Sequence, residues 1–164
     1  MYKQNFGQFP DKTIEWVLLN EPCYHAWIVR ENVHSAQFRG PALERFNLVT
    51  KRAQALKLTT YCQTCQTNLA TGVAFTQDDK NRVKSVFFHC ARCAKEEGIL
   101  LLKPSLLLWP LLYTRDRFGS QKVRTALLSA CGVPMLNDAS NSEMEEFFSN
   151  PDNFTLPVEL AAAA

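Results

Sequence analysis

The chain has 164 residues, of which 46% are hydrophobic, a content that argues against wholesale disorder and allows one ordinary domain or two to three small modules. Its formal net charge of +2 hides a division, because residues 1–124 hold all 18 Lys and Arg against 10 Asp and Glu, whereas residues 125–164 hold 6 acidic residues and no Lys or Arg. A basic body can attract nucleic acid and an acidic end can modulate that attraction or dock elsewhere, although an ordinary solvated surface explains the same charges.

The first predicted element is a helix that begins after Thr13. The hydroxyl of Thr13 can cap this helix, and Ile14 and Val17 recur on its inner face at helical spacing. Trp16 and Trp27 are interpreted as core anchors, with stacking on nucleic-acid bases as the alternative.

Residues 6–28 carry a motif that reads FGQFPDKTIEWV and continues, after a short gap, with PCYHAWI. It resembles the small non-catalytic module found at the C-terminus of exonuclease X-like proteins and in phage proteins. The matching positions are Phe6, Gly7, Lys12, Thr13, Pro22, Tyr24 and Trp27. Gln8 and Asp11 depart from the pattern, which has Lys and Gly there. The resemblance implies a hairpin around Gly7, then a helix from Thr13, and no nuclease activity, because the acidic exonuclease residues belong to another domain.

Residues 1–58 are predicted to form a small α/β unit whose second half is a helix. The pair Gly40-Pro41 breaks the chain, and Pro41 suits the first turn of a helix. Apolar residues then recur at helical spacing, namely Leu43, Phe46, Val49, Ala53 and Leu56. Four basic residues fall largely off this stripe: Arg45, Lys51, Arg52 and Lys57. They form either a solvated helix face or a surface that contacts phosphates.

Residues 59–98 contain two Cys-x-x-Cys pairs, Cys62 with Cys65 and Cys90 with Cys93, separated by the 24 residues 66–89. Each pair can hold one face of a metal ion, and the spacer is long enough for a β-hairpin that brings the pairs together. Four thiolates in a tetrahedron are what Zn²⁺ prefers in a structural site, and they leave no coordination position for a substrate. The sequence therefore predicts one structural Zn²⁺ held by these four cysteines.

Two alternatives to this Cys₄ site stay open. His89 is adjacent to the second pair and could replace a cysteine or support one from outside the metal shell. Cys62 and Cys65 alone could form a thiol–disulfide redox pair. Cys23 and Cys131 have no near partner in the sequence and are interpreted as buried thiols.

The spacer between the cysteine pairs reads as two strands joined by a polar turn. Val73 and Phe75 share one face of the first strand, the turn spans 77–81, and the second strand runs over 82–89. Three cations gather near the turn: Lys80, Arg82 and Lys84. They either contact phosphates or are simply solvated.

Residues 99–164 are predicted to be helical with irregular links and an acidic tail. The apolar run 99–113 is interrupted by Lys103, Pro104 and Pro110, so it is too short and broken to span a bilayer. Pro104 can open a short helix over 105–113. We expect no membrane association.

Two further helices are predicted in this part of the chain. Ser120 can cap a helix that continues to Ala130, and Gly132 can stop it. Ser142 and Glu145 have the spacing of a capping box, which predicts a short helix through 148.

The sequence lacks the patterns of catalytic sites. The histidines, His25, His34 and His89, have no companions that would complete a nuclease or a deaminase motif, and no glycine-rich phosphate loop occurs. We therefore predict no enzymatic activity and no small-molecule substrate.

Together these patterns predict an α+β protein with a hairpin–helix module at 1–58, a zinc-ribbon-like hairpin at 59–98 and a helical region at 99–164. They favour a non-catalytic, zinc-binding, nucleic-acid-binding protein that acts as an accessory or recognition subunit of a DNA- or RNA-processing complex. The residues predicted to contact DNA or RNA are Arg45, Lys51, Arg52, Lys80, Arg82 and Lys84.

The alternative is a protein–protein interaction subunit of a larger nucleoprotein assembly, such as an RNA-guided effector. Such a subunit would dock through the apolar run 99–113 and the helix that carries Phe147 and Phe148. The segment Met1–Pro10 does not read as a secretory signal, and paired cysteines without such a signal favour a reducing compartment, so we expect a cytoplasmic protein.

Overall fold

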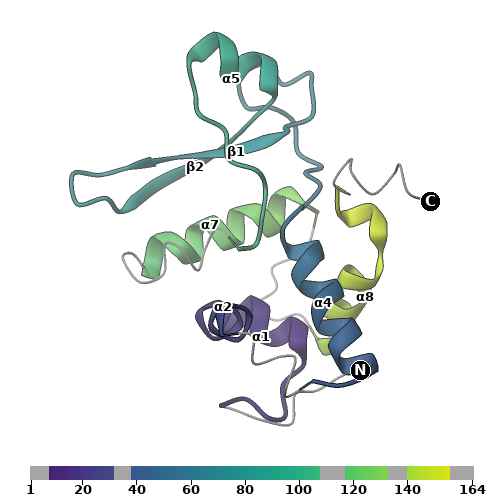
Figure 1. The fold of residues 1–164 in the computed structure, drawn as a ribbon. Helices are drawn as coiled ribbons and strands as arrows, with labels where there is room; N and C mark the ends of the chain where they lie inside the picture. The colour runs from purple at the N-terminus through teal and green to yellow at the C-terminus, as the bar shows by residue number, and fades with distance from the viewer. Residues whose placement is uncertain (1–7, 32–37, 108–116, 133–139, 156–164) are drawn as a thin grey trace.

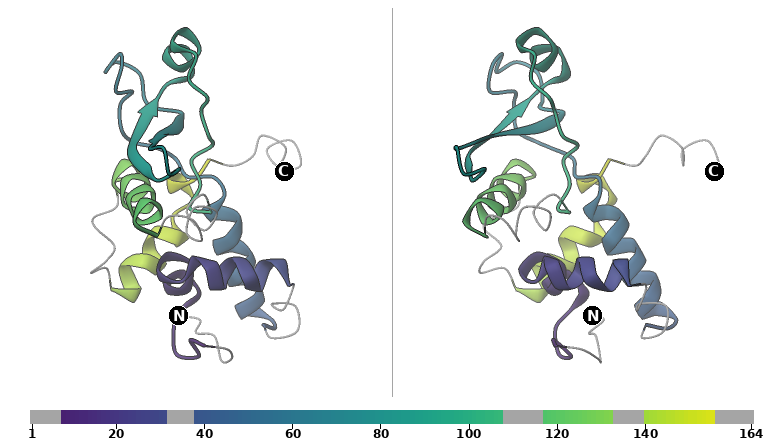
Figure 2. Two further views of the ribbon diagram at one scale, coloured as in Figure 1. Left: turned by 90° about the vertical axis from the view of Figure 1, so that its left-hand side faces the viewer. Right: turned by 60° about the vertical axis from the view of Figure 1, so that its left-hand side comes forward.

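The computed structural model describes residues 8–31, 38–107, 117–132 and 140–155 and confirms the α+β fold class. In these residues helices dominate, and the strands form one antiparallel hairpin (Figure 1). The elements are α1 (Ile14–Asn20), α2 (Pro22–Arg30), α4 (Pro41–Ala53), β1 (Gly72–Gln77), β2 (Val83–His89), α5 (Ala91–Glu97), α7 (Arg117–Ala130), α8 (Asn141–Ser149) and the 3₁₀-helix η1 (Pro151–Asn153). The hairpin and α5 lie at one end, α1, α2, α4 and α8 lie at the other, and α7 lies between them (Figure 2).

A side-chain cap and a proline fix the starts of two N-terminal helices. The Thr13 hydroxyl accepts a hydrogen bond from the backbone N–H of Trp16 at 3.1 Å, so the predicted cap of α1 is confirmed. The predicted helix from Pro41 is also confirmed and is α4. Gly40 precedes it with a φ of +54°, a conformation that glycine adopts without steric penalty. The hairpin expected around Gly7 lies outside the described residues.

Helix α2 places His25 in the core and Trp27 at the surface. His25 is 1% exposed, its ring stacks on Phe46 with 5.2 Å between centroids, and its Nε2 lies 3.1 Å from the Thr50 hydroxyl. Trp27 is 40% exposed and stacks on Tyr24, so the expectation that Trp27 is a core anchor is wrong. An aromatic neighbour lets a large indole pack at the surface without full burial.

The two strands pair in antiparallel register and carry one irregularity near the turn. Thr76 faces Ser85, but the next residue, Gln77, faces Val83, so Lys84 is an extra residue on β2. A bulge of this kind bends the strand and re-aims a side chain. Lys84 is consequently placed on the exposed surface beside the turn.

The structure corrects the predicted start of α7. This helix begins at Arg117, before Ser120, which is fully buried inside the helix. Because Ser120 lies inside α7, it is not the N-cap that the sequence pattern predicted. The predicted end is confirmed, because α7 ends at Ala130 and Gly132 follows with a φ of +74°. Most of the helix predicted over 105–113 lies outside the described residues.

The predicted capping box of α8 is displaced by two residues. The Ser140 hydroxyl accepts a hydrogen bond from the backbone N–H of Glu143, and the Glu143 carboxylate accepts one from the backbone N–H of Ser140 at 2.7 Å. Ser142 and Glu145 have the same spacing, which explains the error. Both versions of the box precede the buried Phe147 and Phe148.

One hydrophobic core joins residues from all three predicted modules. Its members include Leu18, Phe46, Val73, Phe88, Leu127 and Phe148. The boundaries at 58 and 98 stay predictions, but the described segments on either side of them are packed together. No described helix is long and apolar enough to cross a membrane.

The phenylalanines of α8 belong to this core. Phe147 is 9% exposed and Phe148 is fully buried, and the rings of both pack against Phe154. The interaction-subunit hypothesis placed these two side chains against another protein. That part of the hypothesis is wrong, because the fold itself uses both rings.

Candidate metal centre

Four cysteine sulfurs gather where the hairpin meets α5. The Sγ atoms of Cys62, Cys65, Cys90 and Cys93 all lie within 4.8 Å of one another, and those of Cys65 and Cys90 are 4.0 Å apart. A tetrahedral ion with metal–sulfur bonds of about 2.3 Å holds its sulfurs roughly 3.8 Å apart. All four cysteines are free thiols, and they are the one potential metal-binding group of this kind in the described residues. The four residues therefore fit a metal ion.

Local backbone structure positions each pair. In the first pair, the Cys62 carbonyl accepts a hydrogen bond from the N–H of Gln66 at 2.8 Å, and Gln66 adopts a φ of +52°. In the second pair, Cys90 precedes α5, and its carbonyl accepts from the N–H of Ala94 at 3.1 Å. This helical turn brings Cys93 to the same side as Cys90. The hairpin between the pairs supplies the remaining constraint.

Hydrogen-bond donors lower the pKa of a cysteine thiol in this cluster, whereas burial raises it. The Thr67 hydroxyl and the backbone N–H of Asn68 lower the pKa of Cys65 to about 5. Burial raises the pKa of Cys62, but surrounding backbone N–H donors outweigh this effect and leave that pKa below its ordinary value. Burial, together with hydrogen bonds to the other three cysteines, raises the pKa of Cys93 to about 12. Binding of a cation would displace protons from the thiols that still carry them.

His89 lies beside the sulfur cluster and is not part of it. Its side chain is 6% exposed, and its Nδ1 lies 3.1 Å from the Thr64 hydroxyl. The metal-binding group consists of four sulfurs and no imidazole nitrogen. The Cys₃His alternative is therefore not supported, and His89 holds the loop of the first cysteine pair instead. Four sulfurs in one cluster also favour a metal ion over a redox pair, which needs only two.

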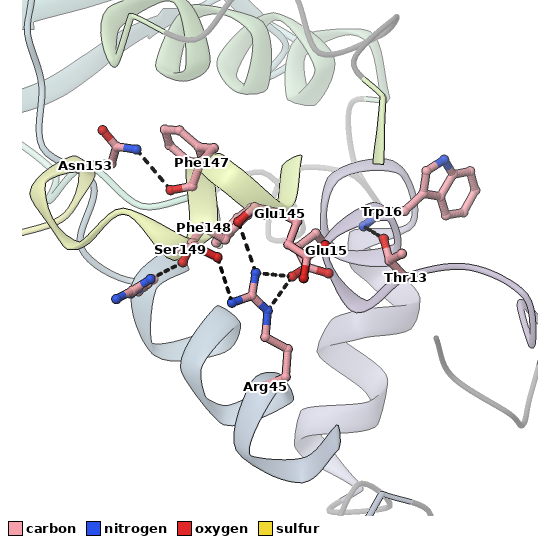
Figure 3. A network of polar contacts seen from close by, with 10 residues as sticks. Thr13, Glu15, Trp16, Arg45, Glu145, Phe147, Phe148, Ser149 and Asn153 are labelled. Atoms are coloured by element: carbon pink, nitrogen blue, oxygen red, sulfur yellow. Dashed lines mark hydrogen bonds and ion pairs between the residues drawn. The ribbon is translucent and has the colours of Figure 1, made fainter. Parts of the chain in front are cut away.

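Arg45, one of the residues predicted to contact nucleic acid, is used inside the fold (Figure 3). Its guanidinium lies 2.6 Å from the Glu15 carboxylate, and the two side chains are only 11% and 4% exposed. It also donates to the Ser149 hydroxyl and to the Glu145 carbonyl, each at 3.2 Å. These contacts engage all three guanidinium nitrogens of Arg45 and join α4 to α1 and α8, so the fold itself uses this side chain.

Arg52 has a similar structural role about two turns further along α4. It donates a hydrogen bond to the Phe148 carbonyl near the end of α8, and its guanidinium lies 5.5 Å from the centroid of the Phe154 ring. Of the four cations predicted on this helix, Lys51 and Lys57 are exposed, and Lys57 lies beyond the end of α4. The predicted basic flank is therefore divided between two arginines with internal contacts and two solvated lysines.

The three cations predicted near the hairpin turn all lie at the surface. Lys80 and Lys84 are exposed, and Arg82 is 60% exposed while it pairs with Asp78 at 2.8 Å. The Asp78 carboxylate also accepts from the backbone N–H groups of Lys80 and Arg82, each at 2.9 Å. Hydrogen bonds from the backbone N–H and the guanidinium of Arg82 lower the pKa of Asp78. The same hydrogen bonds hold the turn in its conformation.

The sequence reasoning missed a second group of residues, on α7. Phe118 is 79% exposed, and it lines two adjoining hollows of about 290 and 620 Å³ together with Lys122. The smaller hollow is also lined by Arg82 and Lys84 of the hairpin. The available signal was the sequence of α7, which contains basic residues and no acidic one.

Comparison of the chain with protein-family models, with curated proteins and with solved structures finds no match. The functional argument consequently depends on the site itself.

Proposed function

We propose that this chain is a non-catalytic, zinc-binding protein that binds nucleic acid, as an accessory or recognition subunit of a cytoplasmic DNA- or RNA-processing complex. One observation carries the proposal: a cluster of four thiols lies at one end of a hairpin whose other end carries exposed cations. The resemblance of residues 6–28 to a module of exonuclease X-like proteins is consistent with such a role.

Zn²⁺ is the metal that this donor set favours. Four thiolates in a closed tetrahedral arrangement suit Zn²⁺, and Cys62, Cys65, Cys90 and Cys93 would hold it. With four protein ligands the ion supplies rigidity and folding free energy, and no position is left for a substrate. Total metal analysis of the purified protein tests this part: one zinc per chain is expected, and a Cys62→Ser variant should lose it.

The polyanion-binding part of the proposal depends on the hairpin turn. Lys80, Arg82 and Lys84 project from a structure that Asp78 fixes through its hydrogen bonds to the turn. Cations on a rigid surface bind phosphates without any base contact, and the affinity falls steeply as salt rises. Lys51 is a further candidate contact, whereas Arg45 and Arg52 are withdrawn from the set.

Fluorescence anisotropy with labelled single-stranded and duplex oligonucleotides tests this part. We expect a Kd on the order of 1–100 μM for the zinc-loaded chain at physiological salt, tightening as salt is lowered. Replacing Lys80, Arg82 and Lys84 by glutamine should weaken binding and flatten the salt dependence by about 0.7–0.9 per lost phosphate contact. A matched variant that replaces the exposed Lys57 and Lys103 should bind as wild type does. Absence of binding by the wild-type chain at low salt would contradict the proposal.

A protein–protein interaction subunit is the second candidate. Exposed apolar side chains near the cysteine cluster favour it: Tyr61 is 58% exposed, Leu69 is 49% exposed, and the two face each other across an isolated bridge. Leu100, just beyond α5, is 82% exposed. Salt separates the two candidates, because an apolar docking surface keeps its affinity at salt concentrations that release a phosphate binder.

A further inference from the structure

The groove between β2 and α7 has the composition of a binding site for a single nucleic-acid strand. It consists of the two adjoining hollows that share Phe118 and Lys122, with volumes of about 290 and 620 Å³. One wall is the end of β2 near the turn, and the other is the exposed face of α7. The two elements lie side by side in the fold (Figure 1).

The α7 wall is built by helical periodicity. Phe118, Lys122, Thr125 and Ser129 recur at intervals of three or four residues, so they lie on one face and line the groove together. The opposite face carries Val123 and Leu127, which are fully buried in the core. The core therefore holds α7 in a fixed orientation with its polar and aromatic face outward.

The β2 wall contributes positive charge. The bulge in the hairpin makes Lys84 an extra residue on β2, and its side chain lines the smaller hollow beside Arg82. Lys122 adds a third cation from α7. The acidic side chain that lines this hollow, Asp78, is already paired with Arg82 at 2.8 Å. The charged side chains that line the smaller hollow therefore sum to +2, which complements a polyanion.

Phe118 distinguishes the groove from an ordinary basic surface. It lies in the first turn of α7 and is 79% exposed, although a phenylalanine ring is usually buried. Proteins that bind single strands combine a positively charged groove with aromatic side chains on which unpaired bases stack. A duplex keeps its bases stacked inside, so it gains nothing from such a ring.

We propose that a single-stranded nucleic acid binds in this groove, with its phosphates on Arg82, Lys84 and Lys122 and an unpaired base stacked on Phe118. This inference rests on the proposed nucleic-acid function and adds the location of the strand and the preference for unpaired bases. Phosphates and unpaired bases are common to DNA and RNA, so the experiment tests a strand of each.

The test measures anisotropy of labelled oligo(dT), oligo(U) and a duplex of matched length with the full zinc-loaded chain. Phe118→Ala should weaken binding of the single strands about 5- to 150-fold, the range that base stacking supports, and should leave duplex binding unchanged. Phe118→Tyr should restore most of the affinity, because it keeps the ring. Leu100→Ala is the matched control, because Leu100 is an apolar residue about as exposed as Phe118, and this variant should bind as wild type does.

Two further readouts keep the outcomes distinct. Photo-crosslinking to a 4-thiouridine strand should label the peptide that contains Phe118, and Lys122→Gln should flatten the salt dependence of single-strand binding by about 0.7. One result would refute single-strand binding in the groove and leave the proposed nucleic-acid function intact. In that result the hairpin-turn variants weaken binding, while Phe118→Ala changes single-strand binding less than about twofold or weakens duplex binding equally. If wild type binds no oligonucleotide at all, both are wrong.

Discussion

Arg45 and Lys51 lie on the same helix and carry the same charge, yet the structure gives them different environments. Arg45 is 11% exposed and satisfies the buried carboxylate of Glu15, whereas Lys51 is exposed to solvent. A buried carboxylate that loses its partner keeps its desolvation penalty and gains no compensating attraction. The role of each cation is therefore set by what the fold places beside it.

We predict that Arg45→Met lowers the free energy of unfolding by about 3–5 kcal/mol, because it leaves Glu15 charged and buried without a partner. Lys51→Met, at an exposed site of α4, should change stability by less than about 0.5 kcal/mol. Adding Glu15→Gln to the Arg45 variant should recover part of the loss. Urea unfolding followed by circular dichroism measures all three. An Arg45 variant that unfolds like wild type but binds oligonucleotides poorly would return Arg45 to the nucleic-acid surface.

Thr67 can influence a metal ion bound at the cysteine cluster through its hydrogen bond to Cys65. Its hydroxyl is the largest contributor to the lowered pKa of Cys65, about 5 against an ordinary value of 9.0. Removing the hydroxyl in Thr67→Val should raise that pKa, so protons compete better with the metal and displace it at a higher pH than in wild type. At neutral pH we expect about 10-fold weaker zinc binding.

Competition with a coloured zinc chelator during an acid titration measures this shift. Thr76→Val is the matched control, because Thr76 is an exposed threonine on β1 away from the thiols. Coincident release curves for the Thr67 variant and wild type would show that the hydroxyl does not stabilise the bound thiolate.

At the scale of elements, two capping boxes of equal spacing compete for the start of α8, Ser140 with Glu143 and Ser142 with Glu145. Ser140→Ala removes the hydroxyl that caps the helix and should lower the free energy of unfolding by about 1 kcal/mol. Ser142→Ala changes an exposed residue within α8 and should have an effect below about 0.5 kcal/mol. Chemical denaturation of the two variants decides between the boxes. The reverse order would restore Ser142 as the cap.

The same cap has a pH dependence. The N–H and hydroxyl of Ser140 lower the pKa of Glu143 from its ordinary value of 4.5. A lowered carboxyl pKa means that the stabilisation is present above this ordinary value and disappears as the pH falls through the lowered pKa. We therefore expect the stability difference between wild type and Ser140→Ala to shrink in acid.

Local patterns explain which elements could be predicted from the sequence. The cap at Thr13, the proline at the start of α4 and the two cysteine pairs each act within a few residues, so their signals are visible in the chain. The internal role of Arg45 was not visible, because its partners Glu15 and Ser149 lie 30 and 104 residues away in the sequence. Such contacts depend on how the helices pack.

At the scale of the molecule, packing also determines where the charges face. The sequence places Lys84 and Lys122 in different predicted modules, and only the packing of α7 against β2 brings them to one groove. The charge asymmetry of the chain indicates a basic body, but it does not show which basic residues share one surface. The arrangement of four cysteines was predictable because their spacing alone limits the possible geometries.

The shared core makes a prediction about metal removal. Val73 and Phe88 of the hairpin pack in the same core as Leu127 of α7 and Phe148 of α8. If zinc holds the ends of the hairpin together, its removal should release these side chains and weaken the helices that pack on them. We expect chelation under reducing conditions to lower Tm by at least about 10 °C, since each kcal/mol shifts Tm by about 2–4 °C in a domain of this size.

Hydrogen exchange locates the effect within the chain. Amides of α7 should lose protection together with those of β1 and β2, because the hairpin and α7 share buried side chains. Cys62→Ser should reproduce the exchange pattern of the chelated wild type without any chelator, which controls for effects of the reagent. Loss of protection confined to the hairpin, with α7 unchanged, would mean that the metal stabilises a separate module and that the shared core contributes little to cooperativity.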